Sequence, residues 1–321
     1  MSILEASPAA APSATLAVRV EHVIPVADGI VSLRLTGVDG APLPTWSPGA
    51  HIDLHLGDVV RQYSLCGVPD EPGYQVAVLR EPASRGGSAY VHEQLSVGDT
   101  LTVSTPRNHF ELRPSPRYLF LAGGIGITPI LTMVRAADAA GADWRLVYGG
   151  RSLATMAFRD ELAAYGDRVQ LRPQDEHGLL DLAGLLGTPL EDTAVYCCGP
   201  APLLSAVEEH CATWPSGSLH VEHFTAAEVD TSADGAFEVE FRASGVTVSV
   251  PAGTSVLDAA AAVGVDIERS CSSGVCGTCE SLLLEGEPDH RDHVLTDEDR
   301  EEGYFMPCVS RALGPRLVLD R

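Results

Sequence analysis

Hydrophobic and polar residues alternate in short runs along the first third of the chain. Residues 16–20, 31–35 and 52–56 place apolar side chains at every second position, which predicts half-buried β-strands. Turns rich in Gly, Pro and Asp separate these runs. Regular short strands divided by turns favour an antiparallel β-barrel, which we place at residues 16–112.

The pattern changes near residue 113, where continuous apolar runs alternate with helical segments. Residues 118–122 and 144–148 predict buried strands, and residues 129–140 between them predict a helix. Strands that alternate with helices favour a parallel α/β sheet, which we place at residues 113–224.

The remaining segments differ in composition from these two parts. Residues 1–15 are rich in Ala, Ser and Pro and lack a basic start or a long apolar run, so we expect a disordered tail and not a signal peptide. Residues 225–235 have the composition of a linker. Residues 236–321 begin with a predicted hairpin and have the length of a small ferredoxin domain. The chain is therefore expected to be multidomain.

Four cysteines near the C-terminal end have the spacing of a plant-type [2Fe–2S] site. Four residues separate Cys271 from Cys276, two separate Cys276 from Cys279, and Cys308 follows after 28 more. A zinc site or unrelated buried thiols are the alternatives, but zinc motifs pair CxxC with a second CxxC or with His at set spacing. We therefore predict an iron–sulfur cluster, which transfers one electron at a time.

The charge of the chain excludes some classes of partner. A formal charge of −23 over 321 residues should repel nucleic acid and anionic membranes. It suits a basic protein partner, although a solubilising surface explains it equally well. No run of 18 apolar residues predicts a transmembrane helix. Cys66, Cys197, Cys198 and Cys211 have no regular spacing, so we expect buried thiols and a cytoplasmic location.

Four shorter motifs suggest bound nucleotides, each weakly by itself. They are Arg61-Gln62-Tyr63-Ser64, Gly87-Ser88, Gly123-Gly124-Ile125-Gly126-Ile127-Thr128-Pro129 and Cys198-Gly199-Pro200. An Arg fork suits phosphate, a Tyr ring packs on a flavin, and glycine-rich junctions allow close approach of a ligand. The plain alternatives are a surface Arg beside a core Tyr, a Gly turn with a Ser N-cap, tight turns and a buried Cys.

Taken in order with the cluster cysteines, these motifs resemble the phthalate dioxygenase reductase family. This family comprises class IA reductases of Rieske oxygenases, including vanillate demethylase reductase subunits. The resemblance covers nearly the whole chain from about residue 16. It implies a ferredoxin reductase-like fold, namely an antiparallel flavin barrel, an α/β nucleotide domain and a C-terminal β-grasp ferredoxin. It also implies FMN in place of FAD. Related reductases with the ferredoxin at the N-terminus usually carry FAD, whereas the ferredoxin of this chain lies at the C-terminal end.

The resemblance further implies roles for individual residues. The residues that it places along the flavin are Arg61, Gln62, Tyr63, Ser64, Ala77, Val78, Leu79, Gly87, Ser88, Thr128 and Phe224. Those along the nicotinamide cofactor are Gly124, Gly126, Arg151, Ser152, Cys198, Gly199 and Pro200. Ser64, Cys198 and Phe224 are expected at the reacting centre. Arg151 lies where the adenosine ribose is expected and could accept a 2′-phosphate, so NADPH stays an alternative to NADH.

The function predicted is an NADH-dependent reductase that passes electrons through FMN and [2Fe–2S] to a separate Rieske-type oxygenase or demethylase. The flavin is needed because nicotinamide gives two electrons together and a cluster accepts one. A reductase for a cytochrome P450 or another monooxygenase is the alternative within enzymes. A redox carrier or sensor without turnover is the alternative from another class. A monomer is the default expectation for the oligomeric state.

Overall fold

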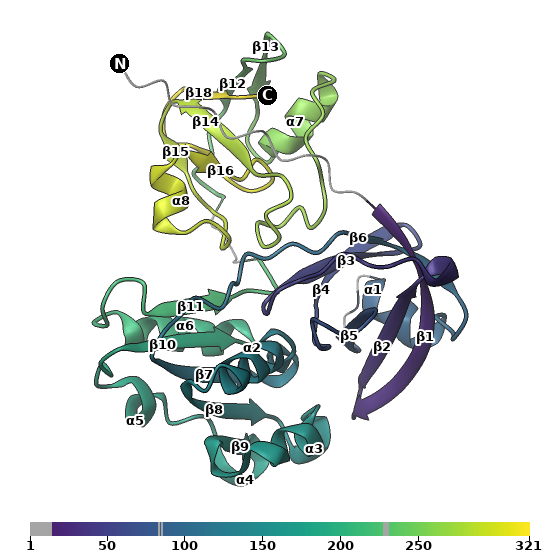
Figure 1. The fold of residues 1–321 in the computed structure, drawn as a ribbon. Helices are drawn as coiled ribbons and strands as arrows, with labels where there is room; N and C mark the ends of the chain where they lie inside the picture. The colour runs from purple at the N-terminus through teal and green to yellow at the C-terminus, as the bar shows by residue number, and fades with distance from the viewer. Residues whose placement is uncertain (1–14, 83, 85, 227–230) are drawn as a thin grey trace.

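The first part of the chain folds as an antiparallel barrel in the computed structural model, which describes residues 15–82, 84, 86–226 and 231–321 (Figure 1). Six strands pair in the order β4-β3-β6-β1-β2-β5. The elements are β1 (Thr15–Ala27), β2 (Ile30–Gly37), η1 (Val38–Gly40), β3 (His51–Leu56), β4 (Val59–Ser64), β5 (Tyr74–Leu79), α1 (Gly87–Glu93) and β6 (Thr100–Ser104). A bridge between Leu65 and Val76 joins the two edges of the sheet and closes the barrel around an apolar core.

The start of β1 differs by one residue from the expected end of the N-terminal tail. Thr15 was expected in the tail, but it pairs with Ser104 of β6 and extends the ladder. The rest of the expected tail, residues 1–14, lies outside the described residues.

The second part has the expected parallel sheet with flanking helices, in the strand order β11-β10-β7-β8-β9. Its strands are β7 (Arg117–Gly123), β8 (Asp143–Gly150), β9 (Val169–Pro173), β10 (Thr193–Cys198) and β11 (Leu219–Glu222). Its helices are η2 (Gly124–Gly126), α2 (Ile127–Ala139), η3 (Leu153–Thr155), α3 (Arg159–Leu162), η4 (Ala163–Arg168), α4 (Gln174–His177), α5 (Leu182–Leu186) and α6 (Ala201–Cys211). The central strands β7 and β10 are almost entirely buried, which explains their continuous apolar sequence.

The third part is a small α+β unit with a five-stranded sheet in the order β13-β12-β18-β14-β16. The predicted hairpin is present, and β12 also pairs in parallel with β18 at the C-terminal end. The elements are β12 (Phe237–Phe241), β13 (Val246–Val250), α7 (Val256–Ala262), β14 (Ser281–Glu285), β15 (Pro288–Asp289), α8 (Asp297–Glu301), β16 (Tyr304–Phe305), β17 (Arg311–Ala312) and β18 (Arg316–Leu319).

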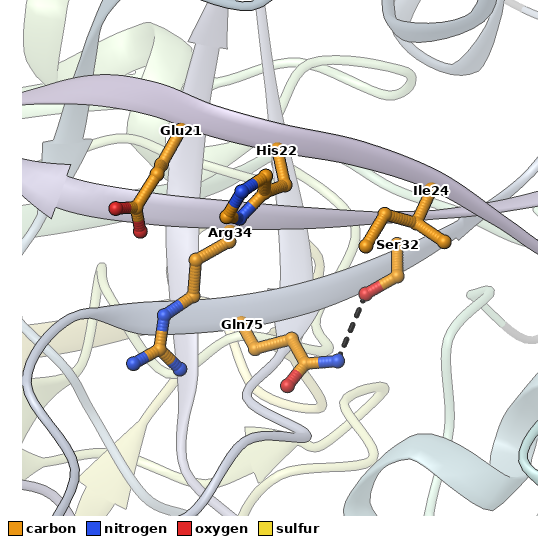
Figure 2. A pocket seen from close by; sticks show the side chains of 6 residues that line it. All are labelled: Glu21, His22, Ile24, Ser32, Arg34 and Gln75. Carbon is orange, nitrogen blue, oxygen red and sulfur yellow. Dashed lines mark hydrogen bonds between the residues drawn. The ribbon is translucent and has the colours of Figure 1, made fainter.

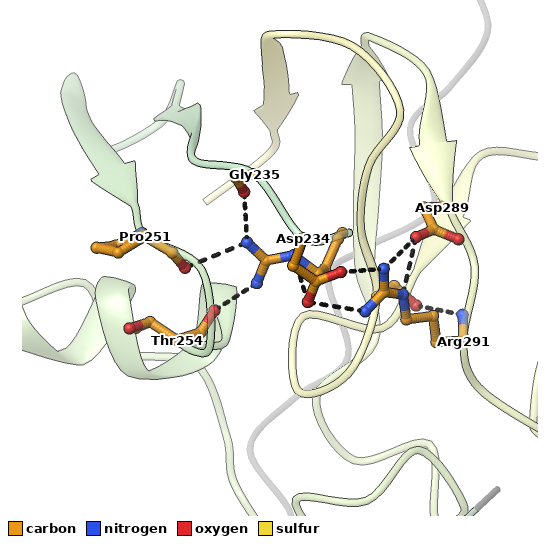
Figure 3. Close-up of polar contacts among 8 residues, drawn as sticks. Asp234, Gly235, Pro251, Thr254, Asp289 and Arg291 are labelled. Atoms are coloured by element: carbon orange, nitrogen blue, oxygen red, sulfur yellow. Dashed lines mark hydrogen bonds and ion pairs between the residues drawn. The ribbon is translucent and has the colours of Figure 1, made fainter. Parts of the chain in front are cut away.

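The segment that leads into the third part is attached to it by buried ion pairs (Figure 3). Asp234 is paired with Arg291 at 2.7 Å and with Arg311 at 3.3 Å. Arg291 also pairs with Asp289 at 2.6 Å. Because these charged groups are mostly shielded from water and mutually paired, they fix the end of the linker to the ferredoxin domain.

A shallow hollow of about 390 Å³ lies on the outer face of the barrel (Figure 2). It is lined by Glu21, His22, Ile24, Ser32, Arg34 and Gln75. Within the described residues, none of the helices is long and apolar enough to span a bilayer.

Candidate redox site

The predicted flavin motif lies on the barrel strand β4 (Figure 1), whose Gln62 contacts Ser270 of the ferredoxin domain. Arg61 packs directly on Gly87 at the start of α1, because a Cβ at Gly87 would lie 2.5 Å from Cγ of Arg61. The fold therefore brings Arg61, which was expected beside the flavin, against Gly87, which was expected at its phosphate. This cradle, formed by a guanidinium and a residue without a side chain, fits a phosphate ester.

The neighbouring edge strand β5 carries Ala77, Val78 and Leu79, whose backbones were expected beside the flavin ring. The carbonyl of Val78 is 2.9 Å from Nε2 of His92, so this acceptor already has a partner. The Ser88 hydroxyl accepts from the Glu81 amide at 3.1 Å and donates to Ser84 at 3.0 Å. The roles expected of these residues toward the flavin stay predictions.

Two glycine-rich loops meet at the carboxyl ends of β7 and β10. These strands pair in parallel, with Ala122 opposite Cys198. A Cβ on Gly126 would collide with the Cys198 carbonyl, and a Cβ on Gly199 would lie 3.0 Å from the Gly123 Cα atom. Gly124 has a φ of +55°, which favours glycine. The backbones therefore pack against each other at a sheet edge where open α/β folds bind nucleotides.

A buried polar cluster that the motifs did not reveal lies between this sheet edge and the barrel. The Cys198 thiol donates to Oε2 of Glu222 at 3.7 Å. The buried Ser64 hydroxyl faces the same carboxyl but makes no hydrogen bond among the described residues. Glu222 is the last residue of β11 and belongs to no recognisable motif. The sequence signal that could have pointed to it is one carboxylate at the end of an alternating apolar strand.

Burial controls the protonation of this cluster. It raises the pKa of Glu222 to about 8, although the hydrogen bond from Cys198 and the nearby Ser64 hydroxyl oppose the shift. Burial, followed by the charge of Glu222, raises the pKa of the Cys198 thiol well above its ordinary value. Glu222 is therefore largely protonated at neutral pH, and Cys198 is a thiol with no nucleophilic character.

The remaining predicted residues lie around this centre with less defined contacts. The Thr128 hydroxyl donates to the Ile125 carbonyl at 3.0 Å at the start of α2. Phe224 follows β11 and is 40% exposed, so its ring has room to cover a ligand. Arg151 is exposed after β8, and the Ser152 amide donates to the Thr155 hydroxyl at 3.2 Å in the turn η3. Their expected cofactor contacts stay predictions.

The four predicted cluster cysteines converge in the ferredoxin domain. Cys271 has Cys276 and Cys308 as close neighbours, and Cys308 in turn lies close to Cys279. The Ser273 amide donates to Sγ of Cys271 at 3.3 Å, and the Thr278 hydroxyl lies 3.2 Å from Sγ of Cys276. Four convergent thiols with additional donors directed at sulfur fit a [2Fe–2S] cluster.

The loop that carries these cysteines touches the barrel directly. A Cβ on Gly277, which has a φ of +74°, would collide with the His109 imidazole. Ser270, the residue before Cys271, hydrogen bonds to Gln62 of β4 and to Asp53 of β3. Because β4 carries the predicted flavin motif, we call it the flavin strand. The cluster loop and the predicted flavin strand are therefore in contact.

Comparisons with known proteins agree with this architecture. The family model of the 2Fe-2S iron-sulfur cluster binding domain matches residues 239–313. The family model of the oxidoreductase NAD-binding domain matches residues 120–209.

Full-length relatives extend the similarity to the barrel. A reductase subunit of the toluene-4-sulfonate monooxygenase system of Comamonas testosteroni is 45% identical, over 96% of this chain and 99% of that protein. The vanillate O-demethylase oxidoreductase of Pseudomonas putida is 43% identical, over 92% and 96% of the two chains. The solved structure of phthalate dioxygenase reductase is 36% identical with a TM-score of 0.69, covering 96% of this chain and 98% of that one.

A fused oxygenase contains the same architecture. The structure of an intact type IV self-sufficient cytochrome P450 monooxygenase is 45% identical, with a TM-score of 0.91. The match covers 99% of this chain but only 43% of that longer chain.

Fold, site and comparisons together define an oxidoreductase that takes electrons from a nicotinamide nucleotide and releases them through an iron–sulfur cluster. The chain belongs to the phthalate dioxygenase reductase family, as its motifs predicted. It is the NADH-dependent reductase component of an oxygenase system and uses FMN and a [2Fe–2S] cluster.

Proposed function

We propose that this chain supplies electrons to a separate Rieske-type aromatic oxygenase or demethylase. The observation that carries the proposed route is the contact between Ser270, which precedes the first cluster cysteine, and Gln62 on the flavin strand. This contact provides a short path from the barrel to the cluster without movement of either domain. The family relatives that are separate chains of the same length include reductases of demethylase and monooxygenase systems.

The proposed division of the chain follows the three modules. Residues 16–112 hold FMN, residues 113–224 hold the nicotinamide nucleotide, residues 225–235 link, and residues 236–321 hold the cluster. The chain acts as a monomer in the cytoplasm, where its buried thiols stay reduced.

In the barrel, the side chains fix one orientation of the flavin. Arg61, Gly87 and Ser88 hold the phosphate of FMN, and Gln62, Tyr63 and Ser64 line its ring. The backbones of Ala77, Val78 and Leu79 would contact the ring. Thr128 and Phe224 would contact it from the nucleotide domain.

At the nucleotide edge of the sheet, the two glycine loops leave room for NADH. Gly124, Gly126, Cys198, Gly199 and Pro200 lie along the nicotinamide half, and Arg151 and Ser152 along the adenosine ribose. Cys198 and Ser64 are buried and Glu222 is partly buried beside them, so these side chains would limit access of water to the place of hydride transfer. Glu222 holds its proton on the carboxyl group at neutral pH.

When bound, FMN would supply a two-electron acceptor for hydride and the cluster a one-electron carrier, which side chains cannot supply, so the two electrons of one NADH would leave in two one-electron transfers. Cys271, Cys276, Cys279 and Cys308 hold the cluster during these transfers.

An anaerobic titration of the purified holoprotein with NADH, and in parallel with NADPH, tests the route. We expect NADH to bleach the flavin and to produce the EPR signal of a reduced [2Fe–2S] cluster. Reduction by NADPH alone would assign Arg151 to the 2′-phosphate and overturn the NADH preference. Failure of both nucleotides to reduce the cluster would contradict the proposed route.

A second acceptor is favoured by one observation, the similarity to the self-sufficient cytochrome P450. The two acceptors can be separated by mixing the reduced protein with a purified Rieske oxygenase such as a vanillate demethylase and with a P450 haem domain. We expect rapid reoxidation by the Rieske protein only. Preferential reoxidation by the haem domain would replace the first proposal with the second.

A further inference from the structure

One buried carboxylate, Asp53, lies at the centre of the contact between the barrel and the ferredoxin domain. Asp53 on β3 is 5% exposed and forms an ion pair of 2.6 Å with Arg107. Nε2 of Gln62 donates to its Oδ1 atom at 3.0 Å. The Ser270 hydroxyl donates to its Oδ2 atom at 2.8 Å. This carboxylate thus connects the flavin strand, the segment after β6 and the residue that precedes the first cluster cysteine.

The protonation state of Asp53 suits this role. Burial by itself opposes ionisation. The charge and hydrogen bond of Arg107, together with the hydrogen bonds of Ser270 and Gln62, nevertheless hold the pKa of Asp53 below its ordinary value. An ionised carboxylate only accepts hydrogen bonds, so the three donors converge on it without competition. Hydrogen bonds to a charged acceptor are stronger and more directional than neutral ones.

The barrel is attached to its two neighbours in different ways. Ile30, Cys66 and Ala77 of the barrel belong to the same apolar core as the helix α2 and the strands β7 and β8 of the nucleotide domain. The core of the ferredoxin domain contains only residues of that domain, from Phe237 to Leu319. Apolar contacts are not directional, whereas hydrogen bonds fix distance and angle. The orientation of the cluster loop therefore depends on its polar contacts.

We propose that Asp53 is a positioning residue for electron transfer, which acts through Ser270 to hold the cluster loop against the flavin strand. This rests on the proposed route from the barrel to the cluster. Asp53 accepts the Ser270 hydroxyl on one oxygen and the flavin strand on the other, so it sets the separation of the two cofactor-bearing segments. Loss of the Ser270 hydroxyl leaves the barrel intact and loosens only the attachment of the loop.

The test is anaerobic stopped-flow mixing of the holoprotein with NADH, in which flavin bleaching and cluster reduction are followed separately. Ser270→Ala is the principal variant. Ser255→Ala is the matched control, because it removes a serine hydroxyl of the same domain that caps α7 by accepting from the Asp258 amide. We expect flavin bleaching at the wild-type rate in both variants. Cluster reduction should slow roughly tenfold in Ser270→Ala only, as for a lost charge-assisted hydrogen bond.

Three further measurements separate positioning from a general structural effect. Ser270→Thr keeps the hydroxyl and should restore the rate of cluster reduction. The double variant of Asp53→Asn and Ser270→Ala should reduce its cluster no more slowly than the slower of the two single variants, because both substitutions act on one contact. Hydrogen exchange of the oxidised holoprotein should rise in residues 51–64 and 268–281 for Ser270→Ala, and not for Ser255→Ala.

The outcomes distinguish this proposal from the proposed function. Wild-type rates of cluster reduction and unchanged hydrogen exchange in Ser270→Ala would overturn the positioning role while the electron route stands. If the wild-type cluster itself is not reduced after NADH bleaches the flavin, the route fails first. Slower flavin bleaching in Ser270→Ala would also contradict the proposal, because the effect would then lie in the barrel.

Discussion

The imidazole rings of His223 and His293 stack face to face, with centroids 3.9 Å apart and an interplanar angle of 12°. His223 follows the last strand of the nucleotide domain, whereas His293 lies in the ferredoxin domain and its amide donates to the Gly274 carbonyl of the cluster loop. Nε2 of His223 is also 3.5 Å from Oε1 of Glu208. The pair is a second attachment point of the ferredoxin domain, and it contains titratable groups.

This stack predicts that acid weakens the attachment. Burial, followed by the proximity of His293, lowers the pKa of His223 from 6.5 to about 4. Above pH 6.5, His223 is neutral in both the docked and the separated state, so it does not change the stability of docking. As the pH falls from 6.5 toward 4, the separated state binds a proton that the docked state does not, and docking is destabilised. We expect reduction of cytochrome c through the cluster to fall over this window, relative to reduction of ferricyanide by the flavin.

The control for this prediction is His223→Phe, which replaces the group with the lowered pKa by a stacking ring that cannot be protonated. The ratio of the two activities should be less sensitive to pH in this variant. An equal loss in the variant and the wild type would attribute the acid effect to other groups.

Glu222 predicts a pH dependence of opposite sign. Its pKa is raised by burial from 4.5 to about 8, so the folded state keeps a proton that the unfolded state releases. The free energy of unfolding should therefore fall as the pH rises from 4.5 to 8, at a rate of up to roughly 1.4 kcal/mol per pH unit. Glu222→Gln cannot ionise and should remove this dependence.

Thermal unfolding of Glu222→Gln and of the wild type at several pH values measures the effect. The exposed Glu209 on α6 provides the control variant Glu209→Gln, which should behave like the wild type. A curve for Glu222→Gln that parallels the wild type would show that Glu222 ionises normally.

Removal of the fourth predicted cluster ligand should separate the two halves of the electron route. Cys308→Ser replaces a buried thiol that reaches both Cys271 and Cys279, so the cluster should be lost or severely destabilised. NADH oxidation by the flavin with ferricyanide as acceptor should continue. Absorbance and EPR spectra check the cluster, with Cys211→Ser as a control that removes a buried thiol of the nucleotide domain. An unchanged cluster spectrum in Cys308→Ser would refute the ligand assignment.

The contact of Gly277 with His109 predicts a specific effect of a methyl group. Gly277→Ala introduces backbone strain of about 1–2 kcal/mol at positive φ and also a collision with His109. Gly264→Ala is the matched control, because Gly264 has a φ of +78° in the same domain and open space around it. Both variants should unfold at a lower temperature than the wild type.

Only Gly277→Ala should also slow electron transfer from flavin to cluster, and the second substitution His109→Ala should restore part of that rate. Equal transfer rates in the two glycine variants would mean that the contact with His109 has no role in docking.

The sequence predicted the modules well because each has its own local pattern. Alternation gave the barrel strands β1, β2 and β3, continuous apolar runs gave β7 and β8, and the hairpin of the ferredoxin domain followed from two short alternating runs. The boundary at Thr15 was missed because one further pair with β6 leaves no mark on composition. Glu222 was missed because its role depends on burial beside Cys198 and Ser64, from two other segments.

By itself, the sequence determined the order of the modules and the four cluster cysteines, because ligand type and spacing are local properties that iron–sulfur chemistry constrains. Only the tertiary structure decided how the cluster loop meets the flavin strand. The bond between Ser270 and Asp53 joins residues 217 positions apart, and the stack of His223 on His293 joins two domains. Such contacts arise from the packing of folded surfaces, and no periodicity or motif along the chain encodes them.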